Sequence, residues 1–186
     1  MRGAGSTPPS APPRSEPHAP GPRHVSQAYE LRTYGPEHRG DYLGLLREAW
    51  GEGALTEAEF DWWFDGNPSG SLRSVAVLDG RVVGVAGQSL YRMVLGGEET
   101  LATFSVHATT HESARGQGIF PALERKHEQE AAERGAAVVL AFASDSTAPI
   151  FLGPLGWTAI GRLRVWARPI GRRRCPAEPP PTTNLL

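Results

Sequence analysis

Residues 109–120 read Thr-Thr-His-Glu-Ser-Ala-Arg-Gly-Gln-Gly-Ile-Phe, a turn that carries arginine and glycine between two regular segments. The run 103–106 before it alternates polar and apolar residues, as a strand does, and the charged segment 122–134 after it is typical of a helix. The first turn of a helix leaves its N–H groups without intrahelical acceptors, at the positive end of the helix dipole. The turn therefore predicts a binding site for phosphate or pyrophosphate.

Each residue of the turn has an expected role at such a site. Gly116 and Gly118 let phosphate oxygens approach the main chain, and the Arg115 side chain adds a permanent positive charge. The predicted ligands are the main-chain N–H groups of Arg115, Gly116, Gln117, Gly118, Ile119 and Phe120. No Gly-Lys-Ser/Thr follows, and Pro121 stands where the dinucleotide fingerprint needs a glycine, so both of those motifs are excluded. An ordinary turn that binds nothing stays as the alternative.

Composition narrows the class of protein. The chain has 186 residues, enough for one domain with a sizeable core, and a formal charge of -1, which suggests neither nucleic acid nor an anionic membrane as a partner. A single cysteine, Cys175, excludes an internal disulfide and a cysteine-based metal site, and we expect no metal. The N-terminus lacks the apolar core of a signal peptide, and no apolar stretch is long enough to span a bilayer. We therefore expect a soluble, cytoplasmic protein.

The organisation along the chain is one folded body between two disordered ends. Residues 1–24 are rich in Pro, Gly, Ser and Ala, so they are expected to form a disordered leader, and residues 172–186 are expected to form a disordered tail. The folded domain is therefore expected to span residues 25–171. No internal repeat is visible in it.

The pattern of the folded body mixes helices with an antiparallel sheet. Asp79-Gly80 between two β-branched runs indicates a tight hairpin, and the wholly apolar segment 137–142 indicates a central strand covered on both faces, parallel to the strand before it. The expected elements are a strand at 29–34, helices at 38–50 and 57–64, strands at 74–78, 81–95 and 100–110, a helix at 122–134, a strand at 137–142, a short helix at 148–152 and a last strand at 159–166.

In this order the elements resemble the GNAT superfamily of acyl-CoA-dependent N-acetyltransferases, over nearly the whole folded body. Arg115-Gly116-Gln117-Gly118-Ile119 matches the core of the family's pyrophosphate signature, and Leu155-Gly156-Trp157 matches the Leu-Gly-Phe after its last helix. The signature's Gln/Arg, three residues before the first glycine, is replaced by Ser113. The resemblance implies an α/β (α+β) fold with a mixed sheet, in which an antiparallel meander is followed by a splayed parallel strand pair and helices cover both faces.

The resemblance also implies acetyl-CoA as the cosubstrate. In the family, its pantetheine amides pair with the main chain in the gap between the splayed strands. Carried onto this chain, Ala108 and Thr110, with Thr109 between them, would face the pantetheine. Asp145 stands where the family often has an asparagine that contacts the cofactor; the alternative is that Asp145 caps the short helix together with Ser146.

The implied reaction is direct attack of an amine on the thioester, which needs a base for the amine and a proton for the leaving thiolate. We predict His107, within the strand before the turn, as the base, with a purely structural histidine as the alternative; His127 is expected on the surface. The tyrosine acid of many relatives has no counterpart, because Phe151 and Leu152 occupy that region, so water, Ser146 or Thr147 would have to supply the proton.

The acceptor is expected to be a small-molecule or protein amine, and a second copy of the chain is left open as a partner. Two other functions are also left open at this point. One is a GNAT-fold sensor or regulatory module that binds acyl-CoA without catalysis. The other is an interaction domain without a cofactor, which would leave the glycine turn unexplained.

Overall fold

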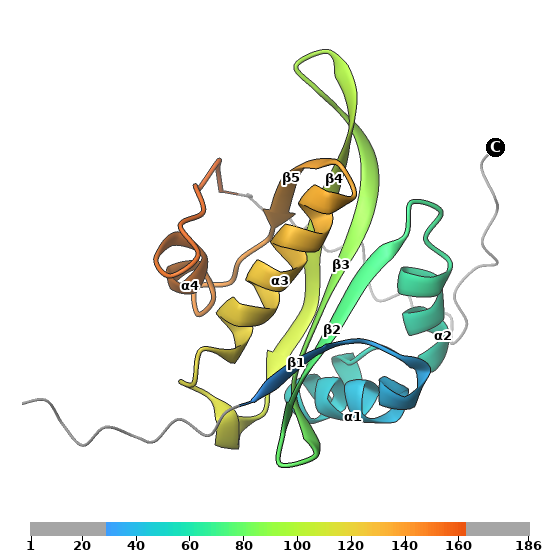
Figure 1. Ribbon diagram of the computed structural model, residues 1–186, viewed down its shortest axis with the longest axis vertical. Helices are drawn as coiled ribbons and strands as arrows, with labels where there is room; N and C mark the ends of the chain where they lie inside the picture. Colours follow the sequence, from blue (N-terminus) through green and yellow to red (C-terminus); the bar gives the residue numbers. More distant parts are fainter. Residues whose placement is uncertain (1–28, 163–186) are drawn as a thin grey trace, which may run out of the picture.

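The computed structural model describes residues 29–162, which form one five-stranded sheet with helices on both faces (Figure 1). This confirms the predicted fold class. The elements in chain order are β1 Glu30–Thr33, α1 Arg39–Trp50, α2 Glu57–Phe60, β2 Ser71–Leu78, β3 Arg81–Leu95, β4 Glu98–Thr110, α3 Ile119–Glu133, β5 Ala136–Ala141 and α4 Ala148–Leu152.

The strands lie in the order β1-β2-β3-β4-β5. The first four pair antiparallel, and β5 pairs parallel with β4 because α3 crosses back between them. Asp79 and Gly80 both have positive φ and join β2 to β3 in the predicted hairpin. β3 and β4 are the longest strands, and their joining hairpin projects beyond the rest of the sheet (Figure 1).

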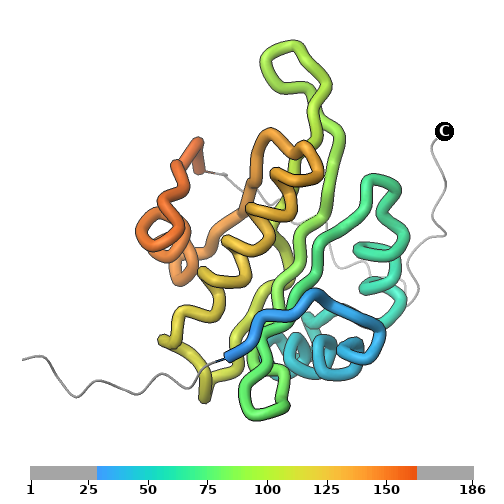
Figure 2. The backbone as a smooth tube through the Cα atoms, viewed as in Figure 1, coloured from blue at the N-terminus to red at the C-terminus, as the bar shows by residue number. Residues whose placement is uncertain are grey.

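The two faces of the sheet are covered by different helices. Val75 and Val85 pack with residues of α1 and α2, whereas their neighbours Ala76 and Ala86 pack with α3. Successive side chains of a strand point to opposite faces, so α1 and α2 lie on one face and α3 lies on the other. α4 lies beside α3, where Phe151 contacts Phe120 with ring centroids 5.5 Å apart. Figure 2 shows the strands running between these two helical layers.

Between α3 and the sheet, two apolar clusters are separated by a layer of polar side chains. One cluster gathers around Ile119 and Leu123, and the other around Leu72, Leu90 and Ala131. The layer between them, here named the polar band, consists of Ser74, Gln88, Thr103, Ser105, Glu124 and His127. Buried polar side chains are usually hydrogen-bonded, and each member of the band bonds at least one other member, although the Nδ1 atom of His127 has no partner among the described residues.

Two expectations about the end of the domain are wrong. β5 is an edge strand within residues 29–162 rather than a central one, and most of it is half-buried; Phe142, just beyond it, is 71% exposed. An apolar run is equally compatible with an edge strand that is covered only in part, which is why the pattern misled. Ala159–Arg162, the described portion of the last expected strand, is not in a strand, and 163–166 lie outside the described residues.

The expected leader at 1–24 and tail at 172–186, with Cys175, also lie outside the described residues. Within residues 29–162, no helix is long and apolar enough to cross a membrane.

Candidate functional site

The glycine turn has the backbone geometry that its sequence predicts. Gly116 and Gly118 adopt φ of 77° and 76°, a left-handed conformation that other residues adopt only with strain. A Cβ placed at either glycine would meet nothing within 4 Å, so the space above the turn is open. Gly118 is the N-cap of α3, a helix of 15 residues, and the dipole of that helix is therefore directed at the turn.

The main-chain amides of this turn are unpaired. Within the described part of the chain, the N–H groups of 116–120 donate to no protein acceptor, and the first amide that bonds back is that of Ala122, to the Gly118 carbonyl. The expectation that the Arg115 amide is also unpaired is wrong, because it donates to the Glu112 carbonyl at 3.3 Å. Unpaired amides at the start of a long helix have the geometry and the partial positive charge that favour an anion.

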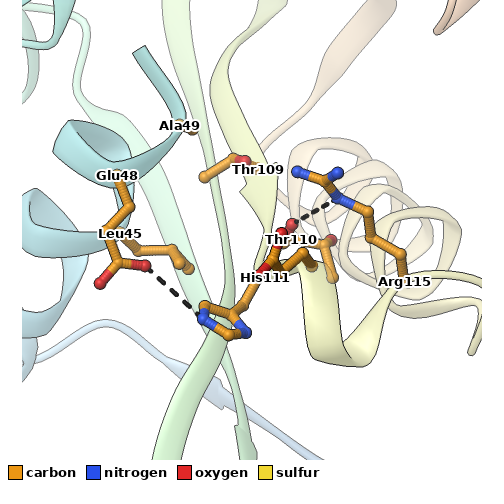
Figure 3. A pocket seen from close by; sticks show the side chains of 8 residues that line it. Leu45, Glu48, Ala49, Thr109, Thr110, His111 and Arg115 are labelled. Atoms are coloured by element: carbon orange, nitrogen blue, oxygen red, sulfur yellow. Dashed lines mark hydrogen bonds and ion pairs between the residues drawn. The ribbon is translucent and has the colours of Figure 1, made fainter. Parts of the chain in front are cut away.

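A pocket of about 360 Å³ connects the turn to the end of β4 and to α1 (Figure 3). On one wall the Nε atom of Arg115 donates to the Thr110 carbonyl at 3.3 Å. On the other, Nε2 of His111 lies 3.7 Å from the Glu48 carboxylate. The lining residues are Leu45, Glu48, Ala49, Thr109, Thr110, His111, Glu112 and Arg115.

Beside this pocket, β4 and β5 part. Their parallel pairing ends where Ser105 faces Ala141, although β4 itself continues to Thr110. Residues 106–110 therefore pair with β3 on one edge and have no β5 partner on the other. We call this opening the wedge.

A β-bulge lies at the start of the wedge. Val85 of β3 faces Thr109 and Gly87 faces Val106, so β4 has one residue more than β3 between these pairs. His107 sits in the bulge with a φ of 49°, and its carbonyl accepts a hydrogen bond from the buried Tyr42 hydroxyl at 3.3 Å.

The bulge changes which face the side chains of β4 reach. Ser105 and Ala108 point to the α3 face, where they contact Glu124 and the Ile119 cluster respectively. Val106 and His107, two consecutive residues, both contact residues of the α1 and α2 face. Side chains on both faces of the sheet therefore lie next to the wedge.

His107 lies among aromatic rings. Its ring centroid is 5.0 Å from that of Trp63, 6.0 Å from that of Phe64 and 6.1 Å from that of Trp50. Burial lowers the pKa of His107 below its usual value, against a smaller opposing effect of the Glu59 carboxylate. Its Nε2 atom is buried and has no hydrogen-bond partner. The imidazole is therefore neutral at neutral pH and able to accept a proton.

On the α3 face, Glu124 is fully buried and both carboxyl oxygens are bonded. Ser105 Oγ lies 2.8 Å from Oε1 and Gln88 Nε2 lies 3.1 Å from Oε2, while Gln88 in turn accepts from Thr103 at 2.8 Å. Burial raises the pKa of Glu124 to about 7, more than the two hydrogen bonds lower it. The carboxyl is thus partly protonated near neutral pH. The pattern did not single out this residue.

His127 is the second ionisable group of the polar band. The expected surface position is wrong, because the side chain is fully buried and its Nε2 lies 3.0 Å from Ser74 Oγ. Burial lowers the pKa of His127 to about 3, so the ring is neutral.

The remaining predicted residues have mixed positions. Ile119 is buried in the core and Phe120 packs on Phe151, so only their main-chain amides face the turn. The Gln117 Oε1 atom is buried without a partner. Asp145 is exposed, and the turn before α4 is held by bonds between Ser144 and Thr147, so the alternative of Asp145 as its cap is wrong.

Comparison with known proteins identifies the family and the fold. Residues 30–160 match the family described as the acetyltransferase (GNAT) domain. No match was found among curated proteins.

Several solved structures share the fold. An acetyltransferase from Trypanosoma brucei superposes with a TM-score of 0.63 at 22% identity, covering 76% of this chain and 100% of its own. The glucosamine-6-phosphate N-acetyltransferase from Arabidopsis thaliana gives 0.61 at 13%, covering 77% and 99%. AAC(6')-Iy, in complex with a bisubstrate analogue of CoA, gives 0.62 at 18%, covering 80% and 99%.

At these identities the solved structures establish the shared fold, while the family match spans most of the chain, including the glycine turn and the wedge. The chain therefore belongs to the GNAT acetyltransferase family.

Proposed function

We propose that the protein transfers an acetyl group from acetyl-CoA to a primary amine, by direct attack of the amine on the thioester. The observation that carries the proposal is the set of unpaired amides at 116–120, which begins a long helix and lies beside an open strand edge. The unpaired amides would bind a pyrophosphate, and the open strand edge would bind an extended chain that carries amide groups.

The residues present fit acetyl-CoA. The amides of 116–120 would hold the pyrophosphate, with the Arg115 guanidinium next to them. The open edge of β4 at Ala108 and Thr110 would pair with the pantetheine amides. The pocket that joins Arg115 to Thr109 and Thr110 supports this path, because it links the phosphate site to the wedge.

The chemistry needs one proton removed and one supplied. When bound, acetyl-CoA supplies the activated acyl group. His107 would take a proton from the amine, directly or through a water, since its burial keeps the ring neutral. The acceptor would approach from the α1 and α2 face, where Trp50 and Trp63 flank His107.

The alternative is a module that binds acyl-CoA without catalysis. The observation that favours it is the composition of α4, Ala-Pro-Ile-Phe-Leu, which offers neither a hydroxyl nor a titratable side chain near the wedge. An enzyme would need another proton donor.

Cofactor binding is tested by thermal shift with three ligands. Acetyl-CoA and dephospho-CoA, which both carry the pyrophosphate, should raise the melting temperature, whereas S-acetylpantetheine, which lacks it, should have little effect. Equal shifts with all three ligands, or none with any, would contradict the phosphate site.

A matched pair of variants localises the site. Gly118→Ala and Gly97→Ala both place a methyl group at a positive φ with nothing within 4 Å, one in the glycine turn and the other at the hairpin tip. We expect Gly118→Ala to weaken acetyl-CoA binding at least about tenfold and Gly97→Ala to leave it unchanged.

Catalysis is tested by release of free thiol from acetyl-CoA with a panel of amines. Glucosamine 6-phosphate, neamine, spermidine, 2-phenylethylamine and a lysine peptide would sample the main acceptor classes. Release with at least one amine supports an enzyme; binding without release from any of them favours the sensor.

A further inference from the structure

We infer that Ser105 is the acid that protonates the departing thiolate, and that the buried Glu124 carboxyl supplies Ser105 with the proton. This inference rests on the proposed acetyl transfer. It assigns the proton donor that α4 lacks, from residues on the α3 face of the wedge.

Ser105 lies at the apex of the wedge. It is the last residue of β4 that pairs with β5, and the strands part from the next residue onward. Its side chain points toward α3 and is half-buried, so it connects the buried band to the opening. One residue, Val106, separates it from His107, yet the bulge directs His107 to the opposite face.

The surroundings of Glu124 favour the protonated form of its carboxyl group. The side chains that face it from β2, β3 and β4 are neutral, and Gln88 and Ser105 are its bonding partners. The nearby charge is Glu128, one turn along α3, which disfavours ionisation, while His127 bonds Ser74 instead. Within residues 29–162, no lysine or arginine bonds Glu124. The raised pKa therefore keeps a proton on this carboxyl near neutral pH.

These groups account for each proton that moves in the reaction. The transfer forms a C–N bond and breaks a C–S bond, so the amine loses a proton and the sulfur gains one. In the structure Ser105 Oγ donates to Glu124 Oε1 at 2.8 Å. With the carboxyl protonated this bond reverses, so that Ser105 Oγ accepts the proton of Glu124 as it passes its own proton to the sulfur. His107 holds the proton taken from the amine. Exchange with solvent between turnovers returns His107 and Glu124 to their starting states.

The experiment compares three variants of the polar band. Ser105→Ala and Glu124→Gln remove the donor and its source, whereas Ser74→Ala removes a more deeply buried hydroxyl that bonds His127 instead. Thiol release is measured with acetyl-CoA and whichever of the five named amines reacts fastest. We expect the first two variants to lower kcat at least about a hundredfold and Ser74→Ala to leave kcat within about threefold.

Three readouts separate a proton donor from a structural role. The dissociation constant of acetyl-CoA, measured by calorimetry, should change less than about threefold in Ser105→Ala. Wild-type kcat should fall as the pH rises above about 7, because the donor is lost, and Glu124→Gln should lack that fall. In the free protein, infrared spectroscopy should show a protonated carboxyl band at mildly acidic pH that Glu124→Gln lacks.

The outcomes are distinguishable. If the wild type releases thiol and Ser105→Ala is equally fast, the inference is wrong while the proposed function stands. If Glu124→Gln does not fold, Ser105→Ala alone decides. If the wild type neither binds acetyl-CoA nor releases thiol, the proposed function fails and the proton transfer fails with it.

Discussion

The two faces of the sheet differ at the point where β4 leaves β5. On the α1 and α2 face, aromatic rings surround His107 and leave its Nε2 without a partner. On the α3 face, the polar band bonds both oxygens of Glu124. Glu124 is fully buried and His107 is half-buried, and burial favours the neutral form of each.

The comparison teaches that one physical cause can produce opposite chemistry. The neutral form of a histidine is a base, and the neutral form of a carboxyl is an acid. Burial on the aromatic face therefore prepares a proton acceptor, and burial in the polar band prepares a proton donor. If both act in catalysis, kcat should show a bell-shaped dependence on pH.

The largest effect on kcat is expected on the α1 and α2 face, where His107 lies among aromatic rings. His107→Asn removes the base, so we predict a fall in kcat of about a hundredfold to ten-thousandfold, measured by thiol release. His38→Asn, which alters a histidine at the opposite end of α1 from Trp50, is the control and should change kcat little. If His107→Asn keeps its activity, His107 is not the base, and the α1 and α2 face has no chemical role in the reaction.

The next effect concerns how the stability of the polar band changes between mildly acidic and neutral pH. Glu124 has a higher pKa in the folded than in the unfolded chain, so the folded state binds more protons between about pH 4.5 and about 7. Its contribution to stability is complete below that window and is lost as the pH rises through it, by about 3 kcal/mol. Denaturant unfolding across this range should show the loss in the wild type and not in Glu124→Gln.

His127 should respond in the opposite direction. Its pKa is lowered to about 3 in the folded chain, so stability is lost as the pH falls below about 6.5. His127→Leu should unfold less readily in acid, relative to its own stability at neutral pH, than the wild type does. If both proteins lose the same free energy of unfolding as the pH falls, His127 is not buried as a neutral ring.

A smaller effect is expected where the two faces meet. The Tyr42 hydroxyl, on the α1 side, holds the His107 carbonyl in the bulge. Tyr42→Phe should lower the free energy of unfolding by about 1 kcal/mol and reduce kcat as well. Tyr91→Phe, at an exposed position of β3, is the control. Loss of stability without loss of activity in Tyr42→Phe would separate the bulge from the chemistry.

The smallest effect concerns the outer edge of the aromatic face. Trp62 is 69% exposed, whereas the neighbouring Trp63 packs against His107. Trp62→Ala should change the free energy of unfolding by less than about 0.5 kcal/mol, and Trp63→Ala by considerably more. Chemical denaturation of the two variants checks whether Trp63, and not Trp62, contributes to the free energy of unfolding.

Much of the fold was predictable from local patterns. The glycine turn, the hairpin at Asp79-Gly80 and the long helix after the turn follow from backbone preferences that each segment carries by itself. The edge position of β5 within residues 29–162 was not, because burial of a strand depends on what lies beside it rather than on its own composition.

The site was predictable only in part. The spacing of Ile119, Leu123, His127 and Ala131, four residues apart, already places His127 on the buried stripe of α3, and reading it would have corrected the surface assignment. Glu124 and Ser105 carried no such signal. Their partnership depends on the register between strands, which separate segments of a chain do not reveal.

The extra residue at His107 has a wider consequence for how this strand evolves and can be engineered. Val106 and His107 share a face, so removing His107 would restore the ordinary alternation of the strand and leave Ala108, Thr109 and Thr110 on their present sides and opposite the same residues of β3. The bulge can therefore lose its extra residue without displacing the residues that follow. A deletion in the regular part of β4 has no such reserve, because it exchanges the two faces for every residue up to the next irregularity.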